Sequence, residues 1–417
     1  MVSRPTRSSS PSAPVGESDA RPEPEAAAAP CPSLDEHGVS LYVHLPFCVS
    51  RCRYCDFNAW AWRGQDLGRH VDAILAEARL RAAELAPQTV FLGGGTPSLL
   101  PAEELARLLD GLAEITGFRG GSIETTIEAN PESLDAATAQ AAREHGADRL
   151  SLGVQSFRPE VLRAYDRAHG PEEVVAAVAA ARAAGFRRLN LDLIFAFPGQ
   201  DPADLAADLG RAVALAPEHL SCYELSFEPG TPLTRARDAG RFPPADPEER
   251  RLELFEQTRR LCAEAGLRRY EVSNFARPGA ECRHNLAYWR SLDWVGLGAG
   301  AAGWRDGERR RNLERPEEYE AAVFAGRDPA AERERPDPRT IAFDCLMMGL
   351  RLEEEGVWLP RVERIAGVDP RRVWPEELER LQREGLVELA GERLRATARG
   401  FVLLDSVLTR LAPGTPV

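Results

Sequence analysis

The strongest chemical signal in the sequence is a group of three cysteines, Cys48, Cys52 and Cys55, spaced Cys-x-x-x-Cys-x-x-Cys. A zinc site is usually closed by four ligands, and no second Cys-x-x-Cys or His pair follows to complete one. A [4Fe-4S] cluster is usually held by four cysteines, so three would leave one iron open to bind a small molecule through nitrogen and oxygen. This arrangement suits reductive cleavage of S-adenosylmethionine (SAM). We therefore expect a [4Fe-4S] cluster, with zinc or a purely structural loop as the alternatives.

A glycine-rich segment, Gly93-Gly94-Gly95-Thr96-Pro97, ends the second predicted strand. Glycine lets backbone amides and carbonyls approach a ligand closely, because no side chain intrudes. A tight strand-to-helix turn is the alternative interpretation. The position of the segment, one strand along from the cysteines, favours ligand binding.

The elements that must position these residues alternate between short apolar strands and longer segments of helical periodicity. This alternation is typical of parallel strands joined by crossover helices. In the helix predicted over 102–116, Leu105, Leu108, Leu109, Leu112 and Ile115 recur at the spacing of one buried stripe. Strands are predicted over 40–44, 89–93, 123–128, 149–154, 189–195, 220–225 and 269–272. The sequence therefore predicts an α/β fold, a partial (β/α)6-type barrel, with its working residues at the carboxyl ends of the strands.

Composition divides the chain into four parts. Residues 1–38 are rich in Ser, Pro, Ala and Glu and lack an apolar stretch, which predicts a disordered low-complexity tail rather than a signal peptide. The barrel is predicted over 39–275 and a linking region over 276–335. Residues 336–417 carry two helical segments and two short strands, which resembles a winged helix, and their nearly balanced charge favours a packing domain over DNA binding.

The overall composition excludes several classes of function. The chain has no lysine, so all 52 basic residues are arginines, and neither a Schiff-base lysine nor a Walker A lysine is available. The net charge of -13 argues against nucleic acid as a partner. No apolar run reaches the length of a membrane span. The eight cysteines are too sparse for a secreted disulfide framework, so we expect a cytoplasmic protein.

Five motifs, in a fixed order, make the chain resemble the radical SAM proteins, and within them the coproporphyrinogen oxidase-like branch, over about residues 39–410. The motifs are the cysteine group, Gly93-Gly94-Gly95-Thr96-Pro97-Ser98, Glu128-Ala129-Asn130-Pro131, Gly153-Val154-Gln155-Ser156-Phe157 and Asn190-Leu191-Asp192-Leu193-Ile194. The resemblance implies that Cys48, Cys52 and Cys55 hold the cluster and that a radical SAM barrel precedes a smaller winged-helix-like α+β domain. The SAM contacts that it implies are Tyr42, Tyr54, Gly94, Gly95, Thr96, Glu128, Gln155, Arg167 and Asp192.

Two departures from the oxidases point to another member of this branch. The oxidases carry a further cysteine two residues after the third, where this chain has Phe57, and their N-terminal substrate segment is replaced by the low-complexity tail. The run His284-Asn285-Leu286-Ala287-Tyr288-Trp289 instead looks like the HNxxYW motif of the haem chaperones of this branch, which is implicated in haem binding. Imidazole binds haem iron, so His284 is a candidate axial ligand, with the Cys282 thiolate as the alternative.

The resemblance thus implies a haem chaperone that carries a [4Fe-4S] cluster and SAM and delivers haem to respiratory haem proteins. A peripheral contact with membrane-bound client enzymes would follow from that role. The alternative is an oxygen-independent coproporphyrinogen III oxidase-like radical SAM enzyme that acts on a porphyrin or porphyrinogen substrate. The sequence assigns no catalytic residue and no oligomeric state.

Overall fold

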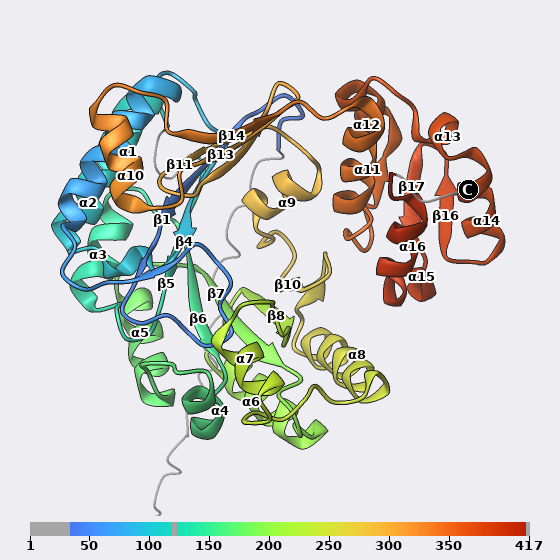
Figure 1. The fold of residues 1–417 in the computed structure, drawn as a ribbon. Helices are drawn as coiled ribbons and strands as arrows, with labels where there is room; N and C mark the ends of the chain where they lie inside the picture. The colour runs from blue at the N-terminus through green and yellow to red at the C-terminus, as the bar shows by residue number, and fades with distance from the viewer. Residues whose placement is uncertain (1–33, 119–122, 414–417) are drawn as a thin grey trace, which may run out of the picture. The chain divides into compact units, whose positions relative to one another are not determined.

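Six parallel strands form the centre of the protein, whose structure, a computed structural model, describes residues 34–118 and 123–413 (Figure 1). Their order in the sheet follows their order in the chain. They are β1 (Ser40–Leu45), β4 (Thr89–Gly94), β5 (Glu124–Ala129), β6 (Arg149–Gln155), β7 (Arg188–Phe195) and β8 (His219–Glu224). Each agrees with its predicted strand to within one residue at either end, so the periodicity of the sequence located them correctly.

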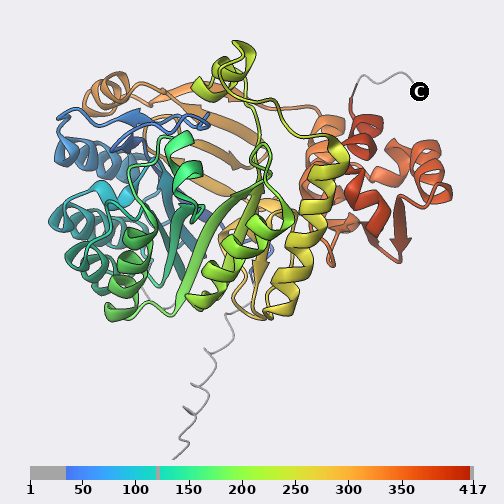
Figure 2. The same ribbon diagram turned by 90° about the horizontal axis from the view of Figure 1, so that it is seen from below.

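Helices connect these strands and cover the outer face of the sheet (Figure 2). The helix α2 shows why they form: Leu105, Leu108, Leu109 and Leu112 are fully buried on one stripe, and Gly117 ends the helix in the left-handed conformation with φ of 78°. The helices of the barrel are α1 (Leu67–Arg81), α2 (Ala102–Thr116), α3 (Ala136–Glu144), α4 (Pro159–Ala164), α5 (Pro171–Ala183), α6 (Pro202–Ala214), α7 (Pro232–Asp238) and α8 (Glu248–Glu264), with a short 3-10 helix η1 (Pro97–Leu99).

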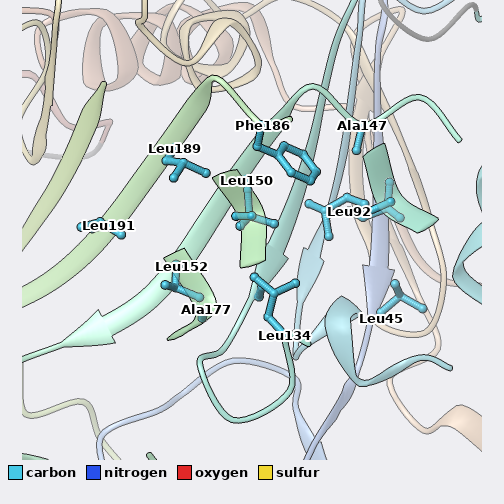
Figure 3. Close-up of a cluster of buried hydrophobic side chains, with 14 of the residues drawn as sticks. Leu45, Leu92, Leu134, Ala147, Leu150, Leu152, Ala177, Phe186, Leu189 and Leu191 are labelled. Atoms are coloured by element: carbon cyan, nitrogen blue, oxygen red, sulfur yellow. The ribbon is translucent and has the colours of Figure 1, made fainter. Parts of the chain in front are cut away.

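The main hydrophobic core lies between the strands and these helices (Figure 3). Leu150 and Leu152 of β6 are buried there together with Leu92 and Phe186. Because successive side chains of a strand point to opposite faces, the alternate residues of β6 face the interior of the barrel. These alternate residues are largely polar, so the interior of the barrel is better suited to binding a ligand than to close apolar packing.

The predicted linking region, 276–335, adds four strands to the same sheet. There β11 pairs in parallel with β1, and β12, β13 and β14 continue as an antiparallel meander. The strand predicted over 269–272 is wrong: β9 and β10 are antiparallel, and the chain turns between them so that Glu271 bridges to Leu352. The ends of the described sheet, β14 and β9, do not pair, so the barrel is partial. The elements outside the central strands are β2 (Phe47–Cys48), β3 (Trp60–Ala61), β9 (Arg268–Arg269), β10 (Asn274–Ala276), α9 (Arg283–Trp289), β11 (Trp294–Leu297), β12 (Ala302–Arg305), β13 (Glu308–Asn312), α10 (Pro316–Phe324) and β14 (Ala330–Glu334).

The C-terminal part has its own core, which includes Trp374, Leu381 and Val407. Its helices pack around a three-stranded sheet in the order β15-β17-β16, in keeping with the winged-helix-like prediction. A two-bond ion pair joins it to the barrel, with Arg269 donating to Glu353 at 2.8 and 2.6 Å. Its elements are α11 (Pro338–Gly349), β15 (Val357–Trp358), α12 (Leu359–Ala366), α13 (Pro370–Val373), α14 (Pro375–Arg383), β16 (Val387–Ala390), β17 (Arg393–Ala396), α15 (Ala398–Val402) and α16 (Leu404–Leu411).

The folded part begins before the predicted boundary at residue 39. Positions 1–33 of the predicted tail lie outside the described residues, but Glu36 accepts a hydrogen bond from Nε of Arg361 at 2.6 Å. The seven cysteines of the described ranges are all free, and Cys31 lies outside them. Over those same ranges, none of the helices combines the length and the apolar character that crossing a membrane requires.

Candidate functional site

The cysteine group lies on a loop that leaves the carboxyl end of β1. Cys48 ends β2, which pairs with β3, and the amide of Cys55 donates to the carbonyl of Cys52 at 3.2 Å. The loop is fastened to the far side of the barrel, because the amide of Arg53 donates to the carbonyl of Tyr165 at 3.0 Å. All three cysteines are half-buried. The fold thus holds a loop that is otherwise without regular structure in one position.

The three thiol groups share one cavity of about 470 Å³, which runs along the interior of the barrel. Each parallel strand from β5 to β8 contributes to its wall, and β6 does so with the alternate residues Arg149, Ser151, Gly153 and Gln155. Seven of the nine SAM contacts implied by the resemblance line this cavity: Tyr54, Gly94, Gly95, Glu128, Gln155, Arg167 and Asp192.

The remaining two implied contacts stand behind the cavity wall. Tyr42 is linked through its hydroxyl to Nδ1 of His44 at 2.7 Å. Thr96 is buried, and its hydroxyl accepts from Nδ2 of Asn130, a wall residue, at 2.8 Å. In this arrangement the two residues support lining groups.

Close packing explains the glycines that follow β4. Gly94 has φ of 100°, and a side-chain carbon added there would lie 2.3 Å from the ring of His44. One added at Gly95 would lie 2.6 Å from the carbonyl oxygen of Leu45. The amides of Gly95 and Thr96 donate back to the chain of β1 and β2, at 2.8 Å each. The glycine-rich segment therefore packs directly against the start of the cysteine loop while it also lines the cavity.

Arg167 connects the cysteine loop to the strands. Its Nη1 donates to the sulfur of Cys52 at 3.3 Å, and its Nη2 donates to Oδ1 of Asn130 and to the carbonyl of Gly153, both at 2.6 Å. Burial raises the pKa of the Cys48 thiol to about 11, and the nearby Cys52 and Cys55 thiols add to the rise. The thiols are thus close enough to interact, and the Cys48 thiol is protonated at neutral pH until a metal displaces the proton.

The three thiols could bind either a zinc ion or a [4Fe-4S] cluster. In the described part of the chain, no group of three or more His, Cys, Asp or Glu side chains is arranged to hold one metal ion. A [4Fe-4S] cube attaches each thiolate to a different iron, so its ligands are spread more widely than those around a single ion. Three thiols that line one cavity can supply the three cysteine ligands of such a cluster.

Two carboxyl groups, of Glu128 and Asp192, line the cavity from β5 and β7, the strands on either side of β6. Burial raises the pKa of Glu128 to about 7, and the negative charge of Asp192 contributes to the rise. The amide of Gly94 donates to Oε2 of Glu128 at 3.0 Å. Asp192 accepts from Nδ2 of Asn190 at 2.8 Å and from the hydroxyl of Ser151 at 3.2 Å. Glu128 can therefore change its protonation state near neutral pH, while Asp192 is held by neutral donors.

Sequence reasoning missed several cavity residues, of which Arg149 is the clearest. It is 2% exposed and lines the cavity; burial lowers the pKa of its guanidinium, but the neighbouring Cys282, Glu124 and Asp192 raise that pKa by more. The signal was present as polar residues at alternate strand positions. Gln155 is also unusual, because it has φ of 67° at an irregularity in the pairing of β6 and β7. Such bulges re-aim side chains near functional sites.

The HNxxYW motif forms α9, which lies between β4 and α11 (Figure 1). His284 is fully buried, and its ring stacks on Phe91 with centroids 5.1 Å apart. Its Nδ1 is hydrogen-bonded to the hydroxyl of Thr89 and its Nε2 to the hydroxyl of Tyr288, both at 2.8 Å. Burial lowers the pKa of His284 to about 3, with the charge of Arg149 contributing. Both ring nitrogens are therefore already in use.

The neighbours of His284 face different surroundings. Asn285 lines the cavity that holds the cysteines, whereas Tyr288 lines a second cavity on the other side of α9. Cys282 is fully buried, and burial raises the pKa of its thiol to about 12, so it is protonated at neutral pH. The helix thus separates two cavities and contributes to both.

Comparisons with known proteins agree with this architecture. Residues 42–212 match the Radical SAM superfamily, and residues 337–403 match the HemN C-terminal domain. Coproporphyrinogen III oxidase (HemN) from Escherichia coli has a solved structure that shares the fold, with a TM-score of 0.77 at 24% identity over 91% of each chain.

Relatives of known name are more similar in sequence. "Heme chaperone HemW" of Mycobacterium tuberculosis is 40% identical over 380 residues, which span 89% of this chain and 94% of that protein. The protein of the same name from Escherichia coli is 36% identical over 384 residues, spanning 89% and 97%. That from Bacillus subtilis is 32% identical over 371 residues, spanning 88% and 97%. The chain therefore belongs to the HemW family within the radical SAM superfamily.

Proposed function

We propose that the protein is a haem chaperone, which binds haem and delivers it to respiratory haem proteins, with a [4Fe-4S] cluster on Cys48, Cys52 and Cys55 and SAM beside it. The observation that carries the proposal is that one cavity is lined both by the three thiols and by Asn285 of the HNxxYW helix. The names of the relatives supply the haem-binding role.

The chain's own residues suit the two cofactors. A bound cluster would supply the electron for reductive cleavage of SAM. Arg167, with donors aimed at Cys52 and into the cavity wall, would orient an anionic group beside the cluster. The carboxylates of Glu128 and Asp192 would accept from hydroxyl or amino groups deeper in the cavity. Burial of these groups limits competing water.

A second candidate function is favoured by Arg149. The buried Arg149 faces the cavity beside Glu124 and Asp192, and its guanidinium donors are suited to a carboxylate of a bound molecule. A porphyrinogen substrate carries such carboxylates, so an oxidase-like radical SAM reaction is the alternative. An anaerobic assay of the iron-loaded protein with coproporphyrinogen III separates the two. Stoichiometric CO2 release would support the enzyme and contradict a chaperone without turnover.

The cluster assignment is tested by replacing a single sulfur. Protein purified without oxygen should contain about four irons per chain, and Cys52→Ala should lose them. The matched control is Cys262→Ala, because Cys262 is a buried cysteine of α8 in the hydrophobic core, away from the cavity. Full iron content in Cys52→Ala, measured beside the control, would contradict the ligand assignment.

A further inference from the structure

The second cavity, to which Tyr288 of α9 contributes, is mainly apolar. Its volume is about 520 Å³, within the range of small-molecule sites. One wall is aromatic: Tyr288, Trp294 and Trp304 line it, and the rings of Tyr288 and Trp294 meet edge to face at 4.8 Å. Flat aromatic surfaces of this kind suit a planar apolar ligand.

The opposite wall is α11 of the C-terminal part, and it is rich in sulfur. The chain contains three methionines, and apart from Met1 they are Met347 and Met348, adjacent on α11 and both lining this cavity. Cys345 lines it as well, but burial raises the pKa of its thiol to about 11, so it is protonated at neutral pH. A thioether needs no deprotonation and is an established axial ligand of haem iron.

Arginines of β13 and the acidic residues Glu332, Glu334 and Asp344 complete the cavity, and Arg310 lacks part of its hydrogen bonding. Nε of Arg310 is buried without a partner within the described residues. Burial and the nearby positive charges of Arg81 and Arg333 lower the pKa of Arg310 to about 10. Arg309 and Arg311, which also line the cavity, are paired with Glu334 at 3.0 Å and Glu314 at 2.9 Å. The Arg310 guanidinium is itself paired with Asp328, to which Nη1 donates at 3.0 Å, so its Nε is the donor left for an additional anion.

These three walls suit a planar, apolar molecule that carries acidic groups on one edge and a metal that accepts thioether ligands. Haem has this chemistry, since it carries two propionates and an iron with axial positions. We propose that the second cavity is the haem site, with a thioether of Met347 or Met348 as axial ligand, Tyr288 and the tryptophans against the macrocycle, and Arg310 toward a propionate. This inference rests on the proposed chaperone function and deepens it.

The role of His284 then differs from direct ligation. Its Nε2 is hydrogen-bonded to the hydroxyl of Tyr288 at 2.8 Å, and its backbone amide donates to the buried Glu124 at 3.0 Å. His284 is thus a positioning residue, which holds the Tyr288 ring in the cavity wall from behind. Its loss should weaken haem binding and leave the axial ligand unchanged.

The test titrates ferric haem into the full-length protein and follows both affinity and the iron–thioether charge-transfer absorption. Met347→Leu/Met348→Leu keeps the volume but removes both sulfurs, so the absorption should vanish and the Kd should rise about tenfold. Met347→Trp fills the cavity and should weaken binding by at least about tenfold. His284→Ala should weaken binding with the absorption retained. Phe343→Leu, on the same helix but outside the cavity, is the control.

The outcomes separate the two proposals. If the wild-type protein binds haem, and the double leucine and tryptophan variants bind it with unchanged affinity and spectrum, the haem site lies elsewhere and this inference is wrong. A changed haem spectrum in His284→Ala, with the spectra of the methionine variants unchanged from the wild type, would return the axial role to His284. If the wild-type protein binds no haem, the chaperone proposal itself fails.

Discussion

Glu77 offers the most direct test of how the structure supports the edge of the barrel. Its side chain is fully buried on α1 and is paired with Arg81 of the next helical turn. It also accepts from the amide of Gly298 at 2.9 Å, Nδ2 of Asn312 at 2.8 Å and the hydroxyl of Tyr319 at 2.7 Å. One carboxylate therefore joins α1 to α10 and to the loop that follows β11.

The expected cost of removing this carboxylate is large. Glu77→Ala leaves Arg81 without its buried partner and three further donors unsatisfied, and breaking a buried ion pair costs about 3–5 kcal/mol. Glu77→Gln keeps the shape and one carbonyl acceptor but loses the charge. It should cost about 1.5–3 kcal/mol, the worth of one hydrogen bond to a charged group.

The measurement is the free energy of unfolding, from guanidinium titrations followed by tryptophan fluorescence and far-UV circular dichroism. Glu114→Ala serves as the control, because Glu114 is exposed on α2 and its loss should change stability by less than about 0.5 kcal/mol. A loss below about 1 kcal/mol in Glu77→Ala would refute the reasoning, since the four contacts could then not be working as a unit.

Two pH-dependent predictions concern other carboxyl groups. Glu128 has a pKa near 7, so its carboxyl group is mostly neutral at pH 6 and mostly charged at pH 8. Because SAM carries a positively charged sulfonium, it should bind about fivefold more tightly at pH 8 than at pH 6. Calorimetric titrations should show that Glu128→Gln abolishes this difference. Partial burial raises the pKa of Glu36, but bonds from Arg361 and Arg364 outweigh it and leave the pKa below 4.5. The stabilisation from Glu36 should therefore be complete above pH 4.5 and decline as the pH falls through the lowered pKa, in thermal unfolding experiments. Glu36→Gln should lack that part of the acid sensitivity; an unchanged acid profile would mean that the contact with α12 contributes nothing.

The central strands were predictable because each is specified by a short run of residues. Apolar runs bounded by glycine caps, such as Gly117 after α2, repeat along the chain and predict parallel strands with crossover helices. The strand predicted over 269–272 failed for a different reason. Its apolar and charged residues turn toward the C-terminal part, where Glu271 bridges to Leu352. That contact lies beyond what local periodicity can indicate.

The cysteine group and the glycine-rich segment could likewise be recognised from spacing, because each is continuous in the chain. By itself the sequence determined the α/β class, the positions of the parallel strands, the triad of thiols and the resemblance to a radical SAM branch. Only the tertiary structure decided what surrounds His284. Its hydrogen-bond partner Thr89 lies 195 positions away in the chain, and its ring is fully buried. Sequence patterns describe which residues are neighbours along a strand or helix. Hydrogen bonds and cavities between distant segments depend on how those elements pack, and that packing gave Tyr288 and the α11 methionines a common space.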